Sequence, residues 1–234
     1  MAIIAHRFDT RDALFGTLRD VVVADIERAL LHRGTASLLL SGGSTPAPLY
    51  RDLAEAELDW SRVQVALVDE RWVAPDDAAS NERLLRESLL TGRAAEARLT
   101  AMKNAAASAL EGVETCNLAY AKLPLPHTVC LLGMGPDGHT ASLFPHAEGL
   151  AAALAAHQHC AAIHAQRSAV TGELVERMTL TPWSILQSER LLLLITGADK
   201  WEVLQQAAAS DDALRTPISH FLHQPRNLEV YWAP

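Results

Sequence analysis

Four short segments of this sequence carry residue types that bind anions or move protons. They are residues 41–46 (SGGSTP), 69–71 (DER), 133–139 (GMGPDGH) and 196–200 (TGADK). Each segment follows on a short apolar run of the length that is typical of a β-strand. Because ligands bind outside the carboxyl ends of the strands in open α/β sheets, we expect the four segments to meet at one rim of a sheet.

Segment 41–46 combines two glycines with hydroxyl side chains and leads into a predicted helix. Successive backbone N–H groups at a helix start, with the hydroxyls of Ser44 and Thr45, favour an anion-binding nest. Gly42 and Gly43 allow the backbone to approach a ligand closely. The alternative is a tight strand–helix turn that binds nothing. No Gly-Lys-Ser/Thr follows, so the segment is not a Walker A loop, which argues against ATP.

Three cations stand near the predicted rim. The planar guanidinium of Arg71 can bind a phosphate or carboxylate through two N–H groups, or it can pair with its acidic neighbours. Lys200 follows a strand end by about one helical turn, where it can reach a phosphate as a point charge or remain solvated. Arg177 begins a β-like segment and supplies a second guanidinium, unless it pairs with the preceding glutamate.

Segment 133–139 spells the dinucleotide fingerprint G-x-G-x-x-G after an apolar run. That site also needs an acidic residue at the end of the next strand, roughly 20 residues on, to hold the ribose. The next predicted strand ends in AIHAQRS, without an acid, and a proline stands inside the motif. These departures argue against a dinucleotide site.

The same segment is better suited to presenting His139. Gly135 and Gly138 permit a sharp turn, and Asp137 can accept backbone N–H bonds and orient its neighbours. A histidine on such a loop is suited to general acid–base catalysis, whereas the alternative is a histidine that only hydrogen-bonds within the loop. We expect His139 to stand at the first turn of a short helix over residues 140–144.

Alternating strand and helix patterns surround these segments. Apolar runs predict strands buried on both faces of a parallel sheet at residues 35–41, 63–69, 128–133, 160–165, 191–196 and 228–233. Helical patterns run from Asp9 or Thr10 to Gly34, from near Pro46, and over 80–90, 106–123 and 199–209. This alternation indicates a single α/β domain over residues 1–234, a sandwich with helices on both faces of a mainly parallel sheet.

Composition excludes several classes of protein. The formal net charge of −8 argues against nonspecific binding to nucleic acid or an anionic membrane. No apolar run approaches the ~20 residues of a membrane span, and the N-terminal residues do not form a signal peptide. Three cysteines at unpatterned spacings favour reduced thiols in a cytoplasmic protein. The group His157, His159, Cys160 and His164 lacks the spacing of a zinc site, so we expect no metal.

Six segments together resemble the family that 6-phosphogluconolactonases share with glucosamine-6-phosphate isomerase/deaminase. They are LSGGSTPAPLY, VDERWV with SNERLL, LLGMGPDGHTASLFP, RMTLTP, LLLITGADK and the ending PISHFL…LEVYWAP, which follow the family order from about Leu40 to Pro234. The Gly-His loop followed by TASLFP is similar to the lactonase branch. The resemblance implies a Rossmann-like three-layer α/β/α fold.

The resemblance also implies an activity. It is hydrolysis of 6-phospho-D-glucono-1,5-lactone to 6-phospho-D-gluconate, the second step of the oxidative pentose phosphate pathway, without a metal or organic cofactor. His139 matches the general base, supported by Asp137. The expected partner is the small-molecule lactone. The protein itself is expected to be a monomer or a weak homo-oligomer. The candidate substrate- and phosphate-binding residues are Ser41, Gly42, Gly43, Ser44, Thr45, Asp69, Arg71, Gly135, Arg177 and Lys200.

Two other functions remain open. In the deaminase branch the Gly-His loop continues with an acidic residue, whereas here no carboxylate follows until Glu148. Sugar-phosphate sensor domains of some transcriptional regulators share the fold but often lose the catalytic base.

The chain departs from the family pattern in two places. It has TPWSILQSER where the family more usually has a TLPxIN stretch, so Ser184 stands near the usual asparagine, and residues 146–172 match poorly.

Overall fold

A seven-stranded, fully parallel sheet forms the centre of the molecule. The computed structural model describes residues 4–224 and 228–234. Each neighbouring pair in this sheet is parallel. In order across the sheet, the strands are β1 (Ile4–Arg7), β10 (Leu228–Ala233), β9 (Ser188–Thr196), β6 (His127–Leu132), β2 (Ala36–Leu40), β3 (Val63–Leu67) and β5 (Arg98–Thr100).

The central strands are buried on both faces, as their continuous apolar runs predicted. Every residue of β2 and of β6 is buried. Helices cover the two faces and supply the outer layers of the sandwich, so the predicted mainly parallel α/β/α fold is confirmed. The helices are α1 (Arg11–Arg33), α2 (Ala47–Ala54), α3 (Asn81–Ser88), α4 (Ala109–Tyr120), α5 (Leu150–Ala155), α6 (Pro182–Ile185), α7 (Ala198–Ala208) and α8 (Ser219–Leu222), with 3₁₀ turns η1 (Trp60–Arg62) and η2 (Gly92–Glu96).

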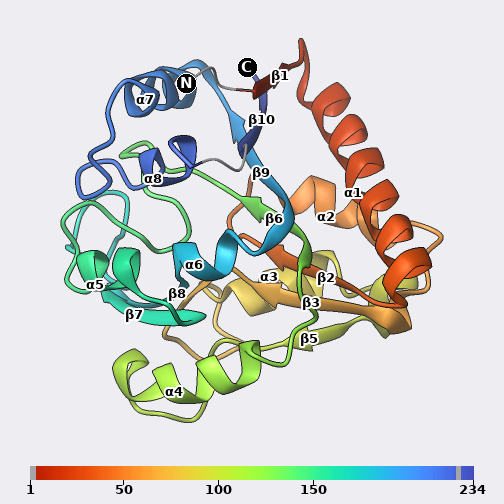
Figure 1. The fold of residues 1–234 in the computed structure, drawn as a ribbon, viewed down its shortest axis with the longest axis horizontal. Coiled ribbons are helices and arrows are strands. Elements are labelled where there is room, and N and C mark those ends of the chain that lie inside the picture. The colour runs from red at the N-terminus through yellow and green to blue at the C-terminus, as the bar shows by residue number, and fades with distance from the viewer. Residues whose placement is uncertain (1–3, 225–227) are drawn as a thin grey trace.

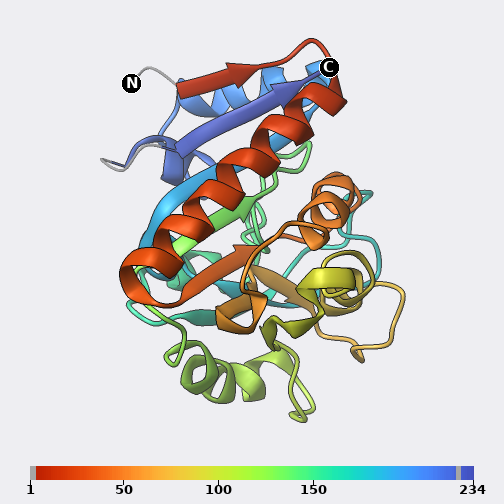
Figure 2. The ribbon, with the colours of Figure 1, turned by 90° about the vertical axis from the view of Figure 1, so that its right-hand side faces the viewer.

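Helix α1 follows the predicted pattern closely. It begins after Thr10, whose side chain accepts a hydrogen bond from the backbone of Ala13, and it ends at Gly34 in the left-handed conformation. Its buried face packs against β2, β6 and β10. Figures 1 and 2 show α1 on one side of the sheet and α7 on the other.

A second, antiparallel sheet lies beside the first. It consists of β4 (Asp69–Arg71), β8 (Glu176–Leu180) and β7 (Cys160–His164) in that order. The prediction that residues 160–165 form a strand of the parallel sheet is therefore wrong. The link between β7 and β8 is too short for the helical crossover that parallel neighbours need, and the two strands pair antiparallel instead. The run 63–69 is also divided, with β3 in one sheet and β4 in the other.

Two features of the described residues bear on the class of protein. No helix in this part of the chain is both long and apolar enough to cross a membrane. Cys116, Cys130 and Cys160 are buried and carry no disulfide.

Candidate active site

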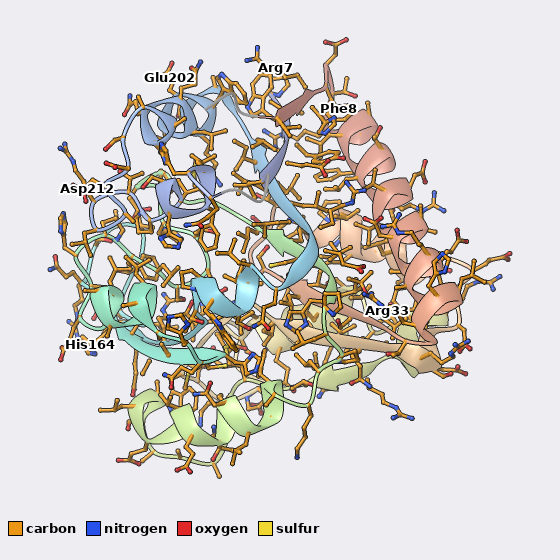
Figure 3. The ribbon with its side chains drawn as sticks, viewed as in Figure 1. Arg7, Phe8, Arg33, His164, Glu202 and Asp212 are labelled. Atoms are coloured by element: carbon orange, nitrogen blue, oxygen red, sulfur yellow. The ribbon has the colours of Figure 1, made fainter. Side chains whose placement is uncertain are left out.

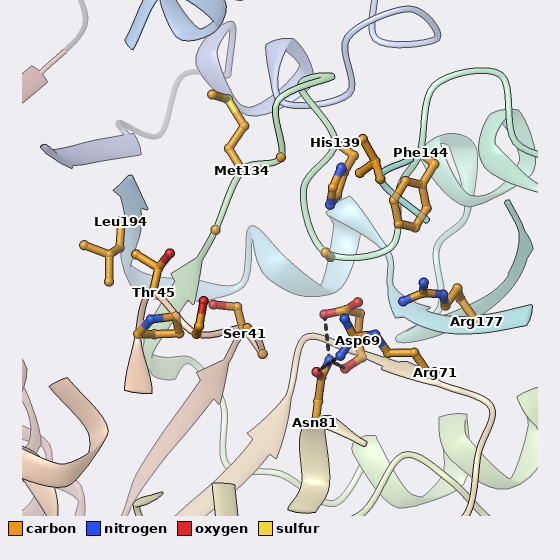
Figure 4. A pocket seen from close by; sticks show the side chains of 18 of the residues that line it. Ser41, Thr45, Asp69, Arg71, Asn81, Met134, His139, Phe144, Arg177 and Leu194 are labelled. Carbon is orange, nitrogen blue, oxygen red and sulfur yellow. Dashed lines mark hydrogen bonds between the residues drawn. The ribbon is translucent and has the colours of Figure 1, made fainter. Parts of the chain in front are cut away.

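The four polar segments meet at one pocket of about 290 Å³ at the carboxyl ends of the parallel strands. Figure 4 shows side chains from different elements directed into it. Asp137 does not line the pocket, but it holds His139, which does. The predicted residues that line the pocket are Ser41, Gly42, Gly43, Ser44, Thr45, Asp69, Arg71, Gly135, His139, Arg177 and Lys200.

The loop after β2 curves around the pocket and leads into α2. Gly43 has a φ of 93°, a conformation that favours glycine, and a Cβ there would meet nothing within 4 Å. The hydroxyl of Tyr50 donates to the carbonyl of Ser41 at 2.6 Å and anchors the loop. No side-chain hydrogen bond caps the start of α2. This backbone geometry suits an anion at the helix start.

Gly42 is needed for a reason that the sequence did not reveal. A Cβ at this position would stand 1.9 Å from Oδ1 of Asn81. The space left by the missing side chain is therefore taken by the Asn81 amide rather than by a ligand. Asn81 itself lines the pocket.

Arg71 is held by neutral oxygen atoms. Its Nη1 donates to the carbonyl of Ala79 at 3.0 Å and to Oδ1 of Asn81 at 2.5 Å. No ion pair of Arg71 is found among residues 4–224 and 228–234. The alternative, a salt bridge between Arg71 and its acidic neighbours, is therefore not found. No ion pair within these residues neutralises the positive charge of the guanidinium, which is directed toward the pocket.

The loop after β6 is built around the imidazole of His139. Nδ1 of His139 lies 2.5 Å from Oδ1 of Asp137, and the same oxygen accepts the backbone N–H of His139 at 3.1 Å. A Cβ on Gly135 would stand 2.0 Å from Cε1 of the ring. The second glycine of the G-x-G-x-x-G motif therefore makes room for a histidine. With Nδ1 engaged, Nε2 is the nitrogen left to act in the pocket.

Asp137 remains the charged partner of this pair. Burial raises the pKa of Asp137, but the hydrogen bonds and the charge of His139 outweigh burial, and the net pKa lies below the ordinary aspartate value. An ionised Asp137 favours a proton on Nδ1 of His139. Its negative charge would also stabilise an imidazolium at this position.

Residues 140–144 form a tight turn, so the predicted helix after His139 is wrong. Ala141 has a φ of 49°, and Thr140 bridges to Leu143. The polar groups of the turn bond to other segments instead of to a helix: Oγ1 of Thr140 donates to the Gly133 carbonyl at 2.8 Å, and Oγ of Ser142 donates to Oδ2 of Asp69 at 2.6 Å. This turn brings the loop after β6 against β4.

Phe144 separates the histidine from Arg177. Its ring lies 4.3 Å from the His139 ring, and the Arg177 guanidinium lies 5.4 Å from the ring of Phe144. Arg177 donates to the carbonyls of Leu174 and Thr171 and makes no pair with Glu176. Burial, and then the charge of Arg71, lower the pKa of Arg177 to about 10. The two arginines face each other across the β4–β8 ladder.

Lys200 completes the set of cations. It stands in the first turn of α7 and lines the pocket, and burial lowers its pKa below the ordinary lysine value. The pocket thus holds three basic side chains and the carboxylate of Asp69, within a chain whose formal net charge is −8. This local excess of positive charge suits a small, highly charged anion.

The histidine-rich segment 157–164 lies elsewhere. His159 contacts Trp183 and the hydroxyl of Ser184, while His164 is exposed at the end of β7 (Figure 3). In the part of the chain that the structure describes, no three His, Cys, Asp or Glu side chains are placed to share a metal ion.

Sequence reasoning missed several residues of the pocket. Asn81 was included only in the predicted helix over residues 80–90, and the cue was its position beside Ser80 at the start of α3. The apolar lining residues gave no separate signal, because Leu194 lies in a run that also builds the core, while Val170 is 39% exposed in the loop between β7 and β8. The lining residues that were not candidate binding residues are Pro46, Gly133 and Met134, which lie in the predicted rim segments, and Asn81, Ala141, Phe144, Val170 and Leu194, which do not.

Comparisons with known proteins agree with this architecture. A family model described as glucosamine-6-phosphate isomerases/6-phosphogluconolactonase matches residues 9–232. A 6-phosphogluconolactonase of Rhizobium meliloti (strain 1021) is 42% identical over 235 residues, covering 100% of both chains. Another, of Pseudomonas aeruginosa, is 40% identical over 91% of this chain and 87% of its own length.

Solved structures give the same result for the fold. A 6-phosphogluconolactonase from Shewanella baltica OS155 superposes with a TM-score of 0.95 at 38% identity, covering 100% of this chain and 98% of the other. A monomeric glucosamine-6-phosphate deaminase superposes with a TM-score of 0.78 at 19% identity, over 99% of this chain and 97% of its own, and that likeness concerns the fold alone.

Proposed function

The chain belongs to the family of glucosamine-6-phosphate isomerases and 6-phosphogluconolactonases, and from this premise we propose that its substrate is 6-phospho-D-glucono-1,5-lactone. It is an enzyme, a lactone hydrolase, as its full-length relatives are. The product is 6-phospho-D-gluconate. The reaction is the second step of the oxidative pentose phosphate pathway.

Catalysis in this proposal rests on His139. A lactone is an activated ester, so a general base that activates water is sufficient and no enzyme nucleophile is needed. Nε2 of His139 takes a proton from water as the oxygen adds to C1, which gives a tetrahedral oxyanion. The ring oxygen then departs and receives that proton from the imidazolium, which leaves a carboxylic acid at C1. This acid releases its remaining proton to solvent and becomes the carboxylate. Asp137 keeps the ring oriented through both steps.

The phosphate of the substrate is held away from the reacting carbon. The backbone N–H groups of the loop after β2, Arg71 and Lys200 supply this anion site, with Arg177 as a further cation of the same pocket. Binding energy from the phosphate positions C1 against His139, so the reaction becomes effectively unimolecular. Backbone N–H groups or a nearby cation stabilise the oxyanion.

The observation that carries the proposal is the His139–Asp137 pair at 2.5 Å in a pocket with three basic side chains. A deaminase would need a further carboxylate beside the histidine. The first one after the loop, Glu148, lies in a bridge with His164 and lines a different pocket. A sensor domain without activity has no need of the ordered imidazole.

A coupled assay tests the proposal. Glucose-6-phosphate dehydrogenase generates the lactone, and its decay is followed with and without the protein against the spontaneous rate. We expect faster decay that scales with protein concentration and no release of ammonia from glucosamine 6-phosphate. Decay at the spontaneous rate, or deamination of the amino sugar, would contradict the assignment.

A further inference from the structure

Asn81 is a pocket residue to which the mechanism above gives no part. It is the first residue of α3, its side chain is 2% exposed, and it lines the pocket. Figure 4 shows its amide beside Asp69 and Arg71. The side chain therefore connects α3 with the rim of the sheet.

Both ends of the Asn81 amide are used. Nδ2 donates to the carbonyl of Asp69 at 2.8 Å, and Oδ1 accepts from Nη1 of Arg71 at 2.5 Å. The first bond fixes which way the amide points, because only its nitrogen can donate. The oxygen then faces the guanidinium. The amide also fills the space beside Gly42, so it touches the loop that forms the anion nest.

A buried carboxylate holds Asn81 in place. Glu70 is fully buried and accepts the backbone N–H groups of Arg71, Asn81 and Glu82, each at 2.8 Å, together with the hydroxyl of Ser80 at 2.9 Å. These bonds tie the start of α3 to β4. Burial raises the pKa of Glu70, although the four donors favour its charged form. The hydrogen bond to Glu70 thus fixes the backbone of Asn81, and the backbone in turn fixes the position of the side-chain amide.

We propose that Asn81 is a positioning residue that orients Arg71 with a neutral acceptor, so that the full charge of the guanidinium remains for the substrate phosphate. This inference rests on the proposed function. A carboxylate at the same place would also accept from Arg71, but it would neutralise the guanidinium in an ion pair. It would in addition lose the bond to the Asp69 carbonyl and bring a second negative charge near Asp69. This position therefore requires the amide group of asparagine, and a side chain of the same shape without an amide does not replace it.

Titration with inorganic phosphate by calorimetry tests this directly. Asn81→Asp keeps the shape of the side chain, whereas Asn81→Ala removes it. We expect Asn81→Asp to weaken phosphate binding by about 10–100-fold and Asn81→Ala by only about 3–10-fold, because the alanine variant leaves Arg71 charged though less ordered. A purely structural role predicts the opposite order, since the aspartate fits the space and the alanine leaves a cavity.

Asn117→Asp is the matched control. Asn117 also joins a helix to a strand, since its Nδ2 donates to the carbonyls of Val113 and Cys160 and its Oδ1 accepts the N–H of Cys160. It lies on α4, away from this pocket. We expect Asn117→Asp to lower the melting temperature and to leave phosphate binding within about twofold of the unaltered protein.

Lactone kinetics separate this inference from the proposed function. Asn81→Asp should raise KM by about the factor found for phosphate, with kcat within about threefold of the unaltered protein. Equal phosphate affinity of Asn81→Asp and the unaltered protein, or a milder effect than that of Asn81→Ala, would overturn the inference. If Asn81→Asp fails to fold, unchanged phosphate affinity of Asn81→Ala overturns it and a loss of about 3–10-fold supports it. An unaltered protein without lactonase activity refutes the proposed function, while the phosphate titration still decides the role of Asn81.

Discussion

The loops after β2 and β6 use the same two kinds of glycine for different purposes. The two strands are neighbours in the parallel sheet. In each loop one glycine makes room for a polar side chain, Gly42 for Asn81 and Gly135 for His139. In each loop another glycine has a positive φ, 93° at Gly43 and 77° at Gly138.

The difference lies in where the inserted side chain comes from. His139 belongs to its own loop, so that loop is a support for one imidazole. Asn81 comes from α3. The loop after β2 therefore keeps its own backbone facing the pocket, and the side chain that supports it comes from another element. Gly43 also faces open space, whereas a Cβ on Gly138 would stand 2.5 Å from Cγ2 of Thr216. A glycine-rich motif therefore does not by itself indicate a nucleotide. What fills the space beside each glycine indicates the function.

The largest effect on catalysis should come from removing the side chain that the loop after β6 supports. His139→Ala is expected to lower kcat by about 10²–10⁴, because it removes the general base. Phosphate affinity, measured by calorimetry, should stay within about twofold, since the anion site belongs mainly to the other loop. An unchanged kcat would remove His139 from the mechanism and would end the comparison.

A matched pair of glycine substitutions sharpens the contrast. Neither Gly135 nor Gly42 has a positive φ, so alanine at either site acts through the neighbouring side chain that it displaces. Gly135→Ala should displace His139 and lower kcat by about 10² or more, with phosphate affinity little changed. Gly42→Ala should displace Asn81 and weaken phosphate binding by about tenfold, with a smaller change in kcat. Identical kinetic profiles of the two variants would show that the loops are not specialised.

The positive-φ glycines should differ in stability rather than in chemistry. Gly43→Ala is expected to lower the free energy of unfolding by about 1–2 kcal/mol, the cost of the left-handed conformation alone. Gly138→Ala should cost about 1–3 kcal/mol more, because its Cβ also meets Thr216. Urea denaturation of the two variants measures this difference, and equal costs would mean that the contact with Thr216 relaxes freely.

The smallest effect concerns the pH dependence of the anion site. Burial lowers the pKa of Lys200, so its positive charge is present at neutral pH and is lost earlier than that of an ordinary lysine as the pH rises. Phosphate binding should therefore weaken by a few-fold between about pH 8 and about pH 10, where the phosphate dianion itself hardly changes. Lys200→Arg should reduce this dependence and leave the part that comes from Arg177, whose pKa is lowered to about 10. If the phosphate affinity of the unaltered protein did not change over this pH range, Lys200 would not be a residue that binds the anion.

Local signals in the sequence predicted the frame of the fold and the place of the site. The cap at Thr10, the stop at Gly34 and the apolar runs of the central strands were read correctly, because they depend on near neighbours and on burial from both faces. Strand β1 was missed, since it is a short edge strand that is only half buried and, within residues 4–224 and 228–234, pairs with β10 alone. The antiparallel pairing of β7 was missed because a strand pattern does not name its partner.

The site was predicted in part for the same reason. The residues that follow the strands could be found, because strand ends share a rim. The turn at residues 140–144 could not, because its conformation depends on bonds to distant segments, such as that from Ser142 to Asp69. Asn81 was hidden in a helix start, where an asparagine already has an ordinary reason to occur.

The pairing of β1 with β10 has a consequence for how the chain reaches this state. A ribosome releases β1 early, yet the strand that must lie beside it is made only after all the other strands of the sheet. Until β10 inserts between β1 and β9, the backbone of β1 has no strand to join and β9 ends the sheet with an open edge. This side of the sheet can therefore close only after its last strand is made, although β1 is the first of its strands to be synthesised.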